Sequence, residues 1–286
     1  PAGFHVGAST GTSGNRGLYV ISDAERYEWL GVLLAKALPR YPFEGARIAL
    51  VLPQVSALYG ATNRAPRLSL RFFDLKAGLE TLAPEICDWK PDTLIAPPKV
   101  LRWLAERCPP AGVRRLFSGA EVMDAPDRTI IEQVFKVPVR EIYMATEGLL
   151  GVACEHGTIH LVEDALHFEL EPVGSDGLVS PVITDFTRTT QIMARYRMND
   201  LLRLRERPCP CGSPLRAVAE IVGRADDILS LPAIDGDRRV EVTPDILRNV
   251  ILDCDGRITD FRLVQVGADR LTLSLPELIS DLGPRV

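Results

Sequence analysis

The chain has 286 residues, of which 46% are hydrophobic and 25% are charged, and its formal net charge is −5. This apolar content excludes an intrinsically disordered chain, and the acidic balance argues against general binding to nucleic acid or to an anionic membrane surface. No apolar run reaches the roughly 18 residues that a membrane helix needs, and the start does not resemble a signal peptide. We therefore expect a cytoplasmic, enzyme-like protein.

The N-terminal half alternates strand-like and helical patterns. Residues 1–17 are expected to form a loop rich in glycine and hydroxyl side chains, followed by a strand over Leu18–Ile21. Ser22 has the position of an N-cap for the helix that comes next. Further strands are predicted at 47–53, 70–74, 93–96, 115–118 and 139–143, and helices at 75–89, 98–107 and 125–135. This alternation favours an open, largely parallel α/β sheet.

Beyond about residue 147 the pattern changes to short β segments separated by turn residues. Such segments are predicted at 158–162, 167–171, 179–185, 191–196 and 215–222. They favour an antiparallel or barrel-like β subdomain. We expect a core over 1–224, with an α/β part to about 147 and the β subdomain over about 148–224, and a small C-terminal α+β domain over 225–286. That domain has a helix predicted near 244–252 and strands at 260–266 and 270–275.

The segment Ser9–Gly17 reads Ser-Thr-Gly-Thr-Ser-Gly-Asn-Arg-Gly and is dense in glycine and hydroxyl groups. Glycine permits positive φ, so that successive backbone N–H groups can converge on an anion, and the hydroxyls add further donors. The segment is neither a Walker A loop nor a dinucleotide-binding fingerprint. On its own it is equally consistent with a phosphate-binding loop and with a surface turn.

Four further motifs follow this loop in a characteristic order. They are Ser118-Gly-Ala-Glu-Val122, Tyr143-Met-Ala-Thr-Glu147, Arg195-Tyr-Arg-Met-Asn-Asp200 and Gly223-Arg-Ala-Asp-Asp227. With the loop, they resemble the phosphate, adenine, magnesium, ribose and hinge motifs of the adenylate-forming superfamily, which includes acyl-CoA synthetases, luciferases and peptide-synthetase adenylation domains. The resemblance covers nearly the whole chain. It implies the adenylate-forming fold, here incomplete at both ends.

Within that superfamily the chain is most similar to the phenylacetate-CoA ligase-like branch. The Gly-Ala-Glu, Cys-x-Cys-Gly and Gly-Arg-x-Asp-Asp strings carry this similarity. The run Thr184-Asp-Phe-Thr-Arg-Thr-Thr-Gln191 also resembles proteins described as related to deazaflavin-cofactor adenylating synthetases.

The resemblance implies ATP-dependent adenylation of a small carboxylic acid with release of pyrophosphate, followed by transfer to the thiol of coenzyme A or of an acyl-carrier protein. It implies catalytic roles for Thr146, for Glu147 as the Mg²⁺ ligand and for Arg224 at the hinge. The residues that it implies for nucleotide binding are Ser9, Thr10, Gly11, Thr12, Ser13, Gly14, Arg16, Gly119, Ala120, Glu121, Tyr143 and Asp200. Taken singly, Glu147 and Asp200 are more simply explained as solvated carboxylates at strand ends.

Three features depart from the family pattern. Arg16 stands where the family usually has lysine, no lysine follows Lys136 although the family's catalytic lysine lies near the C-terminal end, and the chain begins close to the loop. A fragment, a sequence with residues missing and a degenerate member all explain these departures. A nucleotide-binding protein without turnover is therefore a second hypothesis. The acid and the oligomeric state, a homodimer included, stay open, although Leu149 and Leu150 favour an aromatic or aliphatic acid.

Soft metal ligands gather in two further segments, Cys154-Glu-His-Gly-Thr-Ile-His160 and Cys209-Pro-Cys211-Gly. Together they offer enough nitrogen and sulfur ligands for a tetrahedral site. The phenylacetate-CoA ligase-like resemblance implies structural Zn²⁺ on Cys154, His160, Cys209 and Cys211, with His156 as the substitute ligand. Solvated turns with free thiols are the alternative. A zinc-organised interaction module is a third hypothesis for the whole chain.

Overall fold

The computed structural model describes residues 3–8, 17–52, 67–174, 176–234, 238–255, 257–258 and 260–276. The chain divides into two compact units. The first comprises Pro1–Glu169, Val182–Arg197 and Leu204–Ala219, and the second comprises Leu170–Pro181, Met198–Arg203 and Glu220–Val286. The domain limits expected from the sequence remain a prediction.

The first unit is built on a largely parallel sheet, as the alternating pattern predicts. Five strands run parallel in the order β4 (Leu68–Asp74), β3 (Ala46–Leu52), β5 (Thr93–Ala96), β6 (Arg115–Gly119) and β7 (Val139–Ala145). On the far side of β7 the pairing becomes antiparallel through β8 (Gly148–Ala153), β9 (Ile159–Leu161) and the start of β14 (Ala217–Arg224). The carboxyl ends of the parallel strands therefore share one edge.

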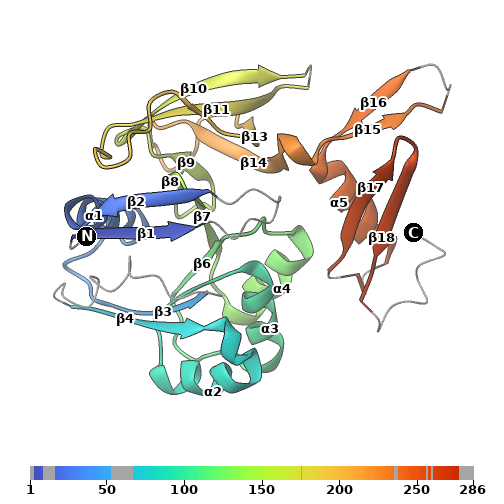
Figure 1. Cartoon of the computed structure of the whole chain (residues 1–286). Coiled ribbons are helices and arrows are strands. Elements are labelled where there is room, and N and C mark those ends of the chain that lie inside the picture. The colour runs from blue at the N-terminus through green and yellow to red at the C-terminus, as the bar shows by residue number, and fades with distance from the viewer. Residues whose placement is uncertain are drawn as a thin grey trace. The chain divides into compact units, whose positions relative to one another are not determined.

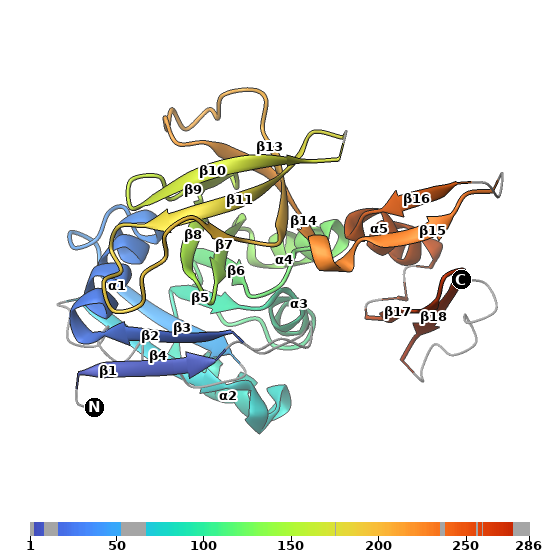
Figure 2. The same cartoon turned by 45° about the horizontal axis from the view of Figure 1, so that its top comes forward.

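Helices cover both faces of this sheet (Figures 1 and 2). α2 (Leu79–Trp89), α3 (Pro98–Arg107) and α4 (Ala125–Phe135) pack on one face, where their apolar side chains join those of the strands in one core. Ile86, Leu104 and Ile131 are fully buried in it. α1 (Asp23–Ala37) lies on the other face, where its leucines and the sheet residues line a small apolar cavity. Each buried aliphatic side chain stabilises the fold by about 1.5–3 kcal/mol.

Local signals predict most of these elements. Ser22 caps α1 as predicted: its Oγ accepts the Glu25 N–H at 3.3 Å, and the Glu25 carboxylate accepts the Ser22 N–H at 2.7 Å. The helix predicted over 75–89 is instead divided, because Gly78 has a φ of +84° and separates the 3-10 turn η2 (Leu75–Ala77) from α2.

Two predictions for irregular or extended segments are wrong. The expected loop over residues 1–17 contains a strand, β1 (Phe4–Ala8), because the following strand β2 (Leu18–Ser22) supplies it with an antiparallel partner. The strand predicted at 191–196 is not formed, and only Tyr196–Arg197 is extended, as β12. Gln191 instead uses its side chain to bond β2.

The second unit contains the small α+β module that the sequence predicts. Its elements are η3 (Ala225–Asp227), β15 (Leu229–Pro232), β16 (Arg239–Val242), α5 (Pro244–Cys254), β17 (Arg262–Gly267) and β18 (Arg270–Ser274). The two strand pairs are antiparallel, and Ile251 and Ile258 form the centre of a local core.

Three longer strands, β10 (Leu166–Val173), β11 (Leu178–Asp185) and β14, have residues in both units. β13 (Asp200–Leu204) pairs with the start of β11 inside the second unit. None of the helices in the described ranges combines the length and the apolar character needed to cross a membrane.

Candidate active site and metal centre

Two of the predicted nucleotide-binding motifs lie at the carboxyl edge of the parallel sheet. β6 and β7 are neighbours in register, with Gly119 opposite Ile142. Gly119, Ala120 and Glu121 end β6 and follow it, while Tyr143 lies in β7. Ligands of open α/β sheets bind at this edge.

Thr146 and Glu147 form the tip of a tight hairpin between β7 and β8. Ala145 pairs with Gly148, so these two residues make the turn, and both are half-buried. The register shifts between Tyr143 and Met144, which is typical of a β-bulge. The strand pairing therefore fixes the backbone of Glu147 at the same edge as Gly119.

Ala120 has an unusual backbone conformation. Its φ is +73°, in the left-handed region that a side chain with a Cβ seldom adopts. This conformation costs about 1–3 kcal/mol and persists where the surrounding structure imposes it, often at functional sites. The sequence contains no signal for this strain, because alanine is an ordinary helix and strand residue.

The predicted phosphate-binding segment, residues 9–17, is called the glycine loop below. Its predicted nucleotide-binding residues lie outside the ranges that the structure describes; they are Ser9, Thr10, Gly11, Thr12, Ser13, Gly14 and Arg16. The flanking strands are described, and Ala8 pairs with Leu18, which brings the two ends of the loop together. The assigned contacts of the loop remain predictions.

The segment 184–191 forms hydrogen bonds with the first turn of α1. The Glu25 carboxylate accepts the backbone N–H groups of Thr189 and Thr190 at 2.6 and 2.7 Å. Burial raises the pKa of Glu25, but hydrogen bonds from Thr190 and Ser22 outweigh it and hold this pKa well below its usual range. A charged, buried carboxylate therefore joins the start of α1 to a segment more than 160 residues later. Sequence patterns did not reveal this role.

The ribose and hinge motifs meet inside the second unit. The Asn199 side-chain oxygen accepts hydrogen bonds from Nη2 and Nε of Arg224 at 2.8 and 3.2 Å. The backbone carbonyl of Asn199 accepts the N–H of Ala225 at 2.6 Å, and its amide donates to Asp226 at 2.5 Å. Asp200 follows directly and begins β13. Two motifs separated by more than twenty residues are thus brought together.

Gly223 allows the hinge motif to approach the small module closely. A Cβ at this position would lie 2.8 Å from the Cβ of Pro244, at the first turn of α5. Any side chain would therefore displace the helix. This close approach ties β14 to the module within the second unit.

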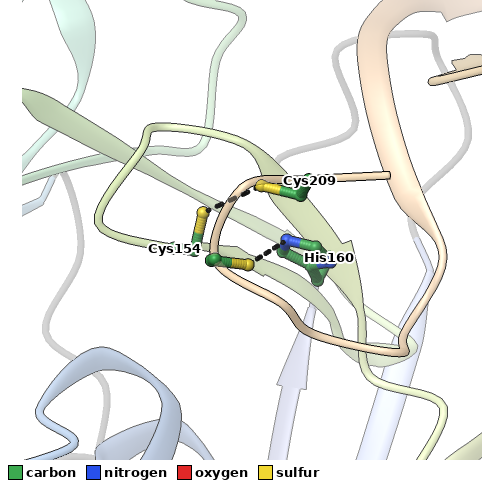
Figure 3. A group of neighbouring side chains, drawn as sticks. Cys154, His160 and Cys209 are labelled. Atoms are coloured by element: carbon green, nitrogen blue, oxygen red, sulfur yellow. Dashed lines mark hydrogen bonds between the residues drawn. The ribbon is translucent and has the colours of Figure 1, made fainter. Parts of the chain in front are cut away.

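The four predicted zinc ligands converge in the first unit. Their ligand atoms all lie within 4.8 Å of one another. The Sγ atoms of Cys154 and Cys209 are 3.7 Å apart, and Cys211 Sγ is 3.3 Å from His160 Nε2. Figure 3 shows the labelled side chains of Cys154, Cys209 and His160 turned toward one another from neighbouring loops and strands.

These distances fit a tetrahedral zinc site. Bond lengths of about 2.3 Å to sulfur and 2.05 Å to nitrogen give edges of roughly 3.8 and 3.6 Å between ligand atoms. His160 Nδ1 lies 3.0 Å from the Leu215 carbonyl, so that Nε2 is left to face the sulfur atoms. His156, the predicted substitute, is not among the four clustered ligands.

The local structure also prepares the Cys209 thiol for a metal. Gly157 and Gly212 each donate a backbone N–H to the carbonyl of the cysteine three residues earlier, at 3.0 and 3.1 Å, which closes two tight turns. Burial raises the pKa of Cys209, but hydrogen bonds from Cys211, Thr158 and His160 lower it to about 6. A thiolate is the form that zinc binds.

Comparison with known proteins finds no matching family model and no matching curated protein. Solved structures do match. A 2-hydroxyisobutyryl-CoA ligase in complex with 2-HIB-AMP covers 98% of the chain, with a TM-score of 0.72 and 20% identity. An anthranilate CoA ligase in complex with anthranoyl-AMP covers 98%, with a TM-score of 0.66 and 11% identity. The amide bond synthetase McbA from Marinactinospora thermotolerans covers 96%, with a TM-score of 0.65 and 13% identity.

The chain spans 64%, 60% and 59% of the length of these three proteins. At identities this low, the likeness concerns the fold. It agrees with the parallel sheet, the antiparallel β segments and the small α+β module described above. The chain has the fold of adenylate-forming enzymes.

Proposed function

We propose that this protein binds magnesium ATP, adenylates a small carboxylic acid and passes the acyl group to a thiol. The observation that carries the proposal is the placement of Thr146 and Glu147. They lie at the tip of the β7–β8 hairpin, on the sheet edge where ligands bind, in a fold shared with acid–CoA ligases.

The chemistry consists of two displacements. A carboxylate oxygen attacks the α-phosphorus of ATP, the bond to the bridging oxygen breaks, and pyrophosphate leaves with the electron pair. A thiolate then attacks the acyl carbon, and AMP leaves. Both steps depend mainly on positioning and on stabilisation of negative charge.

Each candidate residue has a part in this scheme. Glu147 would hold Mg²⁺, a hard cation that prefers carboxylate and phosphate oxygens, and Thr146 would contact phosphate. The segment Gly119–Glu121 and Tyr143 would border the adenine. Asp200 would bind the ribose hydroxyls, with Arg224 against the nucleotide. The glycine loop, including Thr12 and Arg16, would hold the outer phosphates.

The resemblance of the sequence motifs to adenylate-forming enzymes also suggests the thiol acceptor and the branch of the superfamily. Coenzyme A is the thiol that we propose first, with an acyl-carrier protein as the alternative. The convergence of Cys154, His160, Cys209 and Cys211 supports the phenylacetate-CoA ligase-like branch. Four protein ligands would close the coordination sphere of zinc, so the metal would stabilise the β segments and take no part in the reaction.

The alternative function is a protein that binds ATP or an acyl-adenylate without turnover. The two functions differ in whether a single turnover yields an acyl-adenylate.

Exchange of labelled pyrophosphate into ATP tests the proposal. The purified protein is supplied with Mg²⁺ and a panel of aromatic and fatty acids. We expect acid-dependent exchange that Glu147→Gln abolishes, while Glu80→Gln, an exposed carboxylate on α2, leaves it unchanged. ATP binding without exchange would favour the non-catalytic alternative. Absence of both exchange and ATP binding would contradict the proposal.

A further inference from the structure

One arginine connects three parts of the first unit. The Arg188 guanidinium donates to the backbone carbonyl of Glu147 at 2.8 Å and to that of Val20 at 3.1 Å. A third hydrogen bond, at 2.9 Å, goes to the side-chain oxygen of Gln191. The turn with the proposed magnesium ligand is therefore linked to the strand that follows the glycine loop.

Gln191 completes the same contact along the edge of β2. Its side-chain oxygen accepts the N–H of Val20 at 3.0 Å, and its amide donates to the carbonyl of Leu18 at 3.2 Å. The other edge of β2 pairs with β1, where Val20 lies opposite Val6. The side chains of Arg188 and Gln191 thus form hydrogen bonds with the backbone of β2 at this edge, as a neighbouring strand would.

The burial of Arg188 is unfavourable for stability by itself. Its exposed fraction is 9%, its three partners are uncharged oxygens, and its Nε has no hydrogen-bond partner among the described residues. A buried cation loses its hydration, and this cost is offset only through the hydrogen bonds that the cation donates. Those bonds go to the turn at Glu147 and to β2, so the cation joins these two parts of the unit.

We propose that Arg188 is a positioning residue, which holds the backbone of Glu147 and that of β2 in one geometry for a magnesium nucleotide. This inference rests on the proposed function. The hydrogen bond goes to the backbone of Glu147, so the carboxylate is left for the metal. The contact to Val20 acts on β2, only a few residues after the loop. Ligands fixed in advance bind a metal more tightly than ligands that must be ordered on binding.

Matched variants separate positioning from stability. Arg188→Met keeps most of the volume and removes the donors, and Arg188→Lys keeps the charge with fewer directed donors. Arg115→Met is the control. Arg115 also makes three hydrogen bonds in the first unit, to Thr93, Gly45 and Asp92, but it lies at the start of β6, at the opposite end of that strand from Gly119.

The measurement is the binding of Mn²⁺, in place of Mg²⁺, followed by electron paramagnetic resonance with a non-hydrolysable ATP analogue. We expect Arg188→Met to weaken Mn²⁺ binding about tenfold and Arg188→Lys to retain part of the lost affinity. Arg115→Met should lower the melting temperature but leave the affinity for Mn²⁺ unchanged. Equal binding by wild type and both Arg188 variants, or equal weakening in Arg115→Met, would overturn the inference while leaving the proposed function. No binding of Mn²⁺ and analogue by the wild type would remove the proposed function, and this inference with it.

Discussion

The side chain of Asn199 accepts a hydrogen bond from the Arg224 guanidinium at 2.8 Å and so joins the ribose motif to the hinge motif. Asn199→Ala removes this acceptor together with the amide that donates to Asp226. We expect the KM for ATP to rise about tenfold, because a side-chain acceptor of a charged donor contributes about 1.5–3 kcal/mol. Steady-state kinetics of pyrophosphate exchange give this value.

Asn249→Ala is the matched control, since Asn249 is exposed on α5. An equal change of KM in both variants would show that Asn199 has no specific role.

Loss of one cluster ligand should remove zinc. In Cys211→Ser and His160→Ala we expect the metal content to fall from about one zinc per chain to near zero, because a structural site needs all four ligands. The melting temperature should fall by about 10 °C, as metal binding contributes folding free energy. Elemental analysis and a thermal melt measure the two effects.

Cys254→Ser serves as the control, because Cys254 is exposed and lies outside the cluster. Wild-type protein purified without any bound zinc, and insensitive to added zinc, would contradict the proposed metal site.

Glu25 should make stability depend on pH. Its carboxylate oxygens accept hydrogen bonds from Thr189, Thr190 and Ser22, and Glu25→Gln would turn one of these acceptors into a donor. We expect a loss of about 2 kcal/mol in the free energy of unfolding at neutral pH. Urea titrations of wild type and variant measure it.

The sign of the pH effect follows from the lowered pKa. Because the pKa of Glu25 is lower in the folded protein than the value of about 4.3 in the unfolded chain, its stabilising contribution is fully present above that pH. It is lost as the pH falls from there toward the folded-state pKa. The difference in the free energy of unfolding between wild type and Glu25→Gln should therefore narrow below about pH 4. A difference that stays constant below this pH, or an equal difference for the exposed control Glu28→Gln, would refute this role.

The strain at Ala120 predicts a stabilising substitution. Ala120→Gly removes the Cβ that disfavours a φ of +73°, and the free energy of unfolding should rise by about 1 kcal/mol. Lys136, the C-cap of α4, has a φ of +59° and offers a control of the same kind in Lys136→Gly. Both variants should gain stability in denaturant titrations, but only Ala120→Gly should raise the KM for ATP. A stability loss in Ala120→Gly would contradict the account of the strain.

The sequence predicts the α/β part of the fold well because its signals are local. The helix that begins after Ser22 and those over 98–107 and 125–135 follow from caps and apolar periodicity alone. The predicted strand at 191–196 failed because Gln191 bonds Leu18 and Val20, more than 170 residues earlier. Contacts at such separations leave no periodic pattern in the sequence.

The candidate site likewise has residues that the sequence predicts and residues that it does not. The four zinc ligands could be named from spacing and resemblance, and strand pairing of His160 with Ala217 brings them together. The roles of Arg188 and Glu25 could not be named, because a buried charge that bonds distant backbone groups resembles any surface charge in the sequence. The φ of Ala120 likewise could not be predicted, because alanine seldom adopts a positive φ.

Calorimetric titration of magnesium ATP into the wild type and into Glu147→Gln tests the central claim most directly. The claim is that the β7–β8 turn supplies the magnesium ligand of a nucleotide site. It predicts saturable binding by the wild type and binding at least about tenfold weaker in the variant. Absence of binding by the wild type, or identical binding by both proteins, would contradict it.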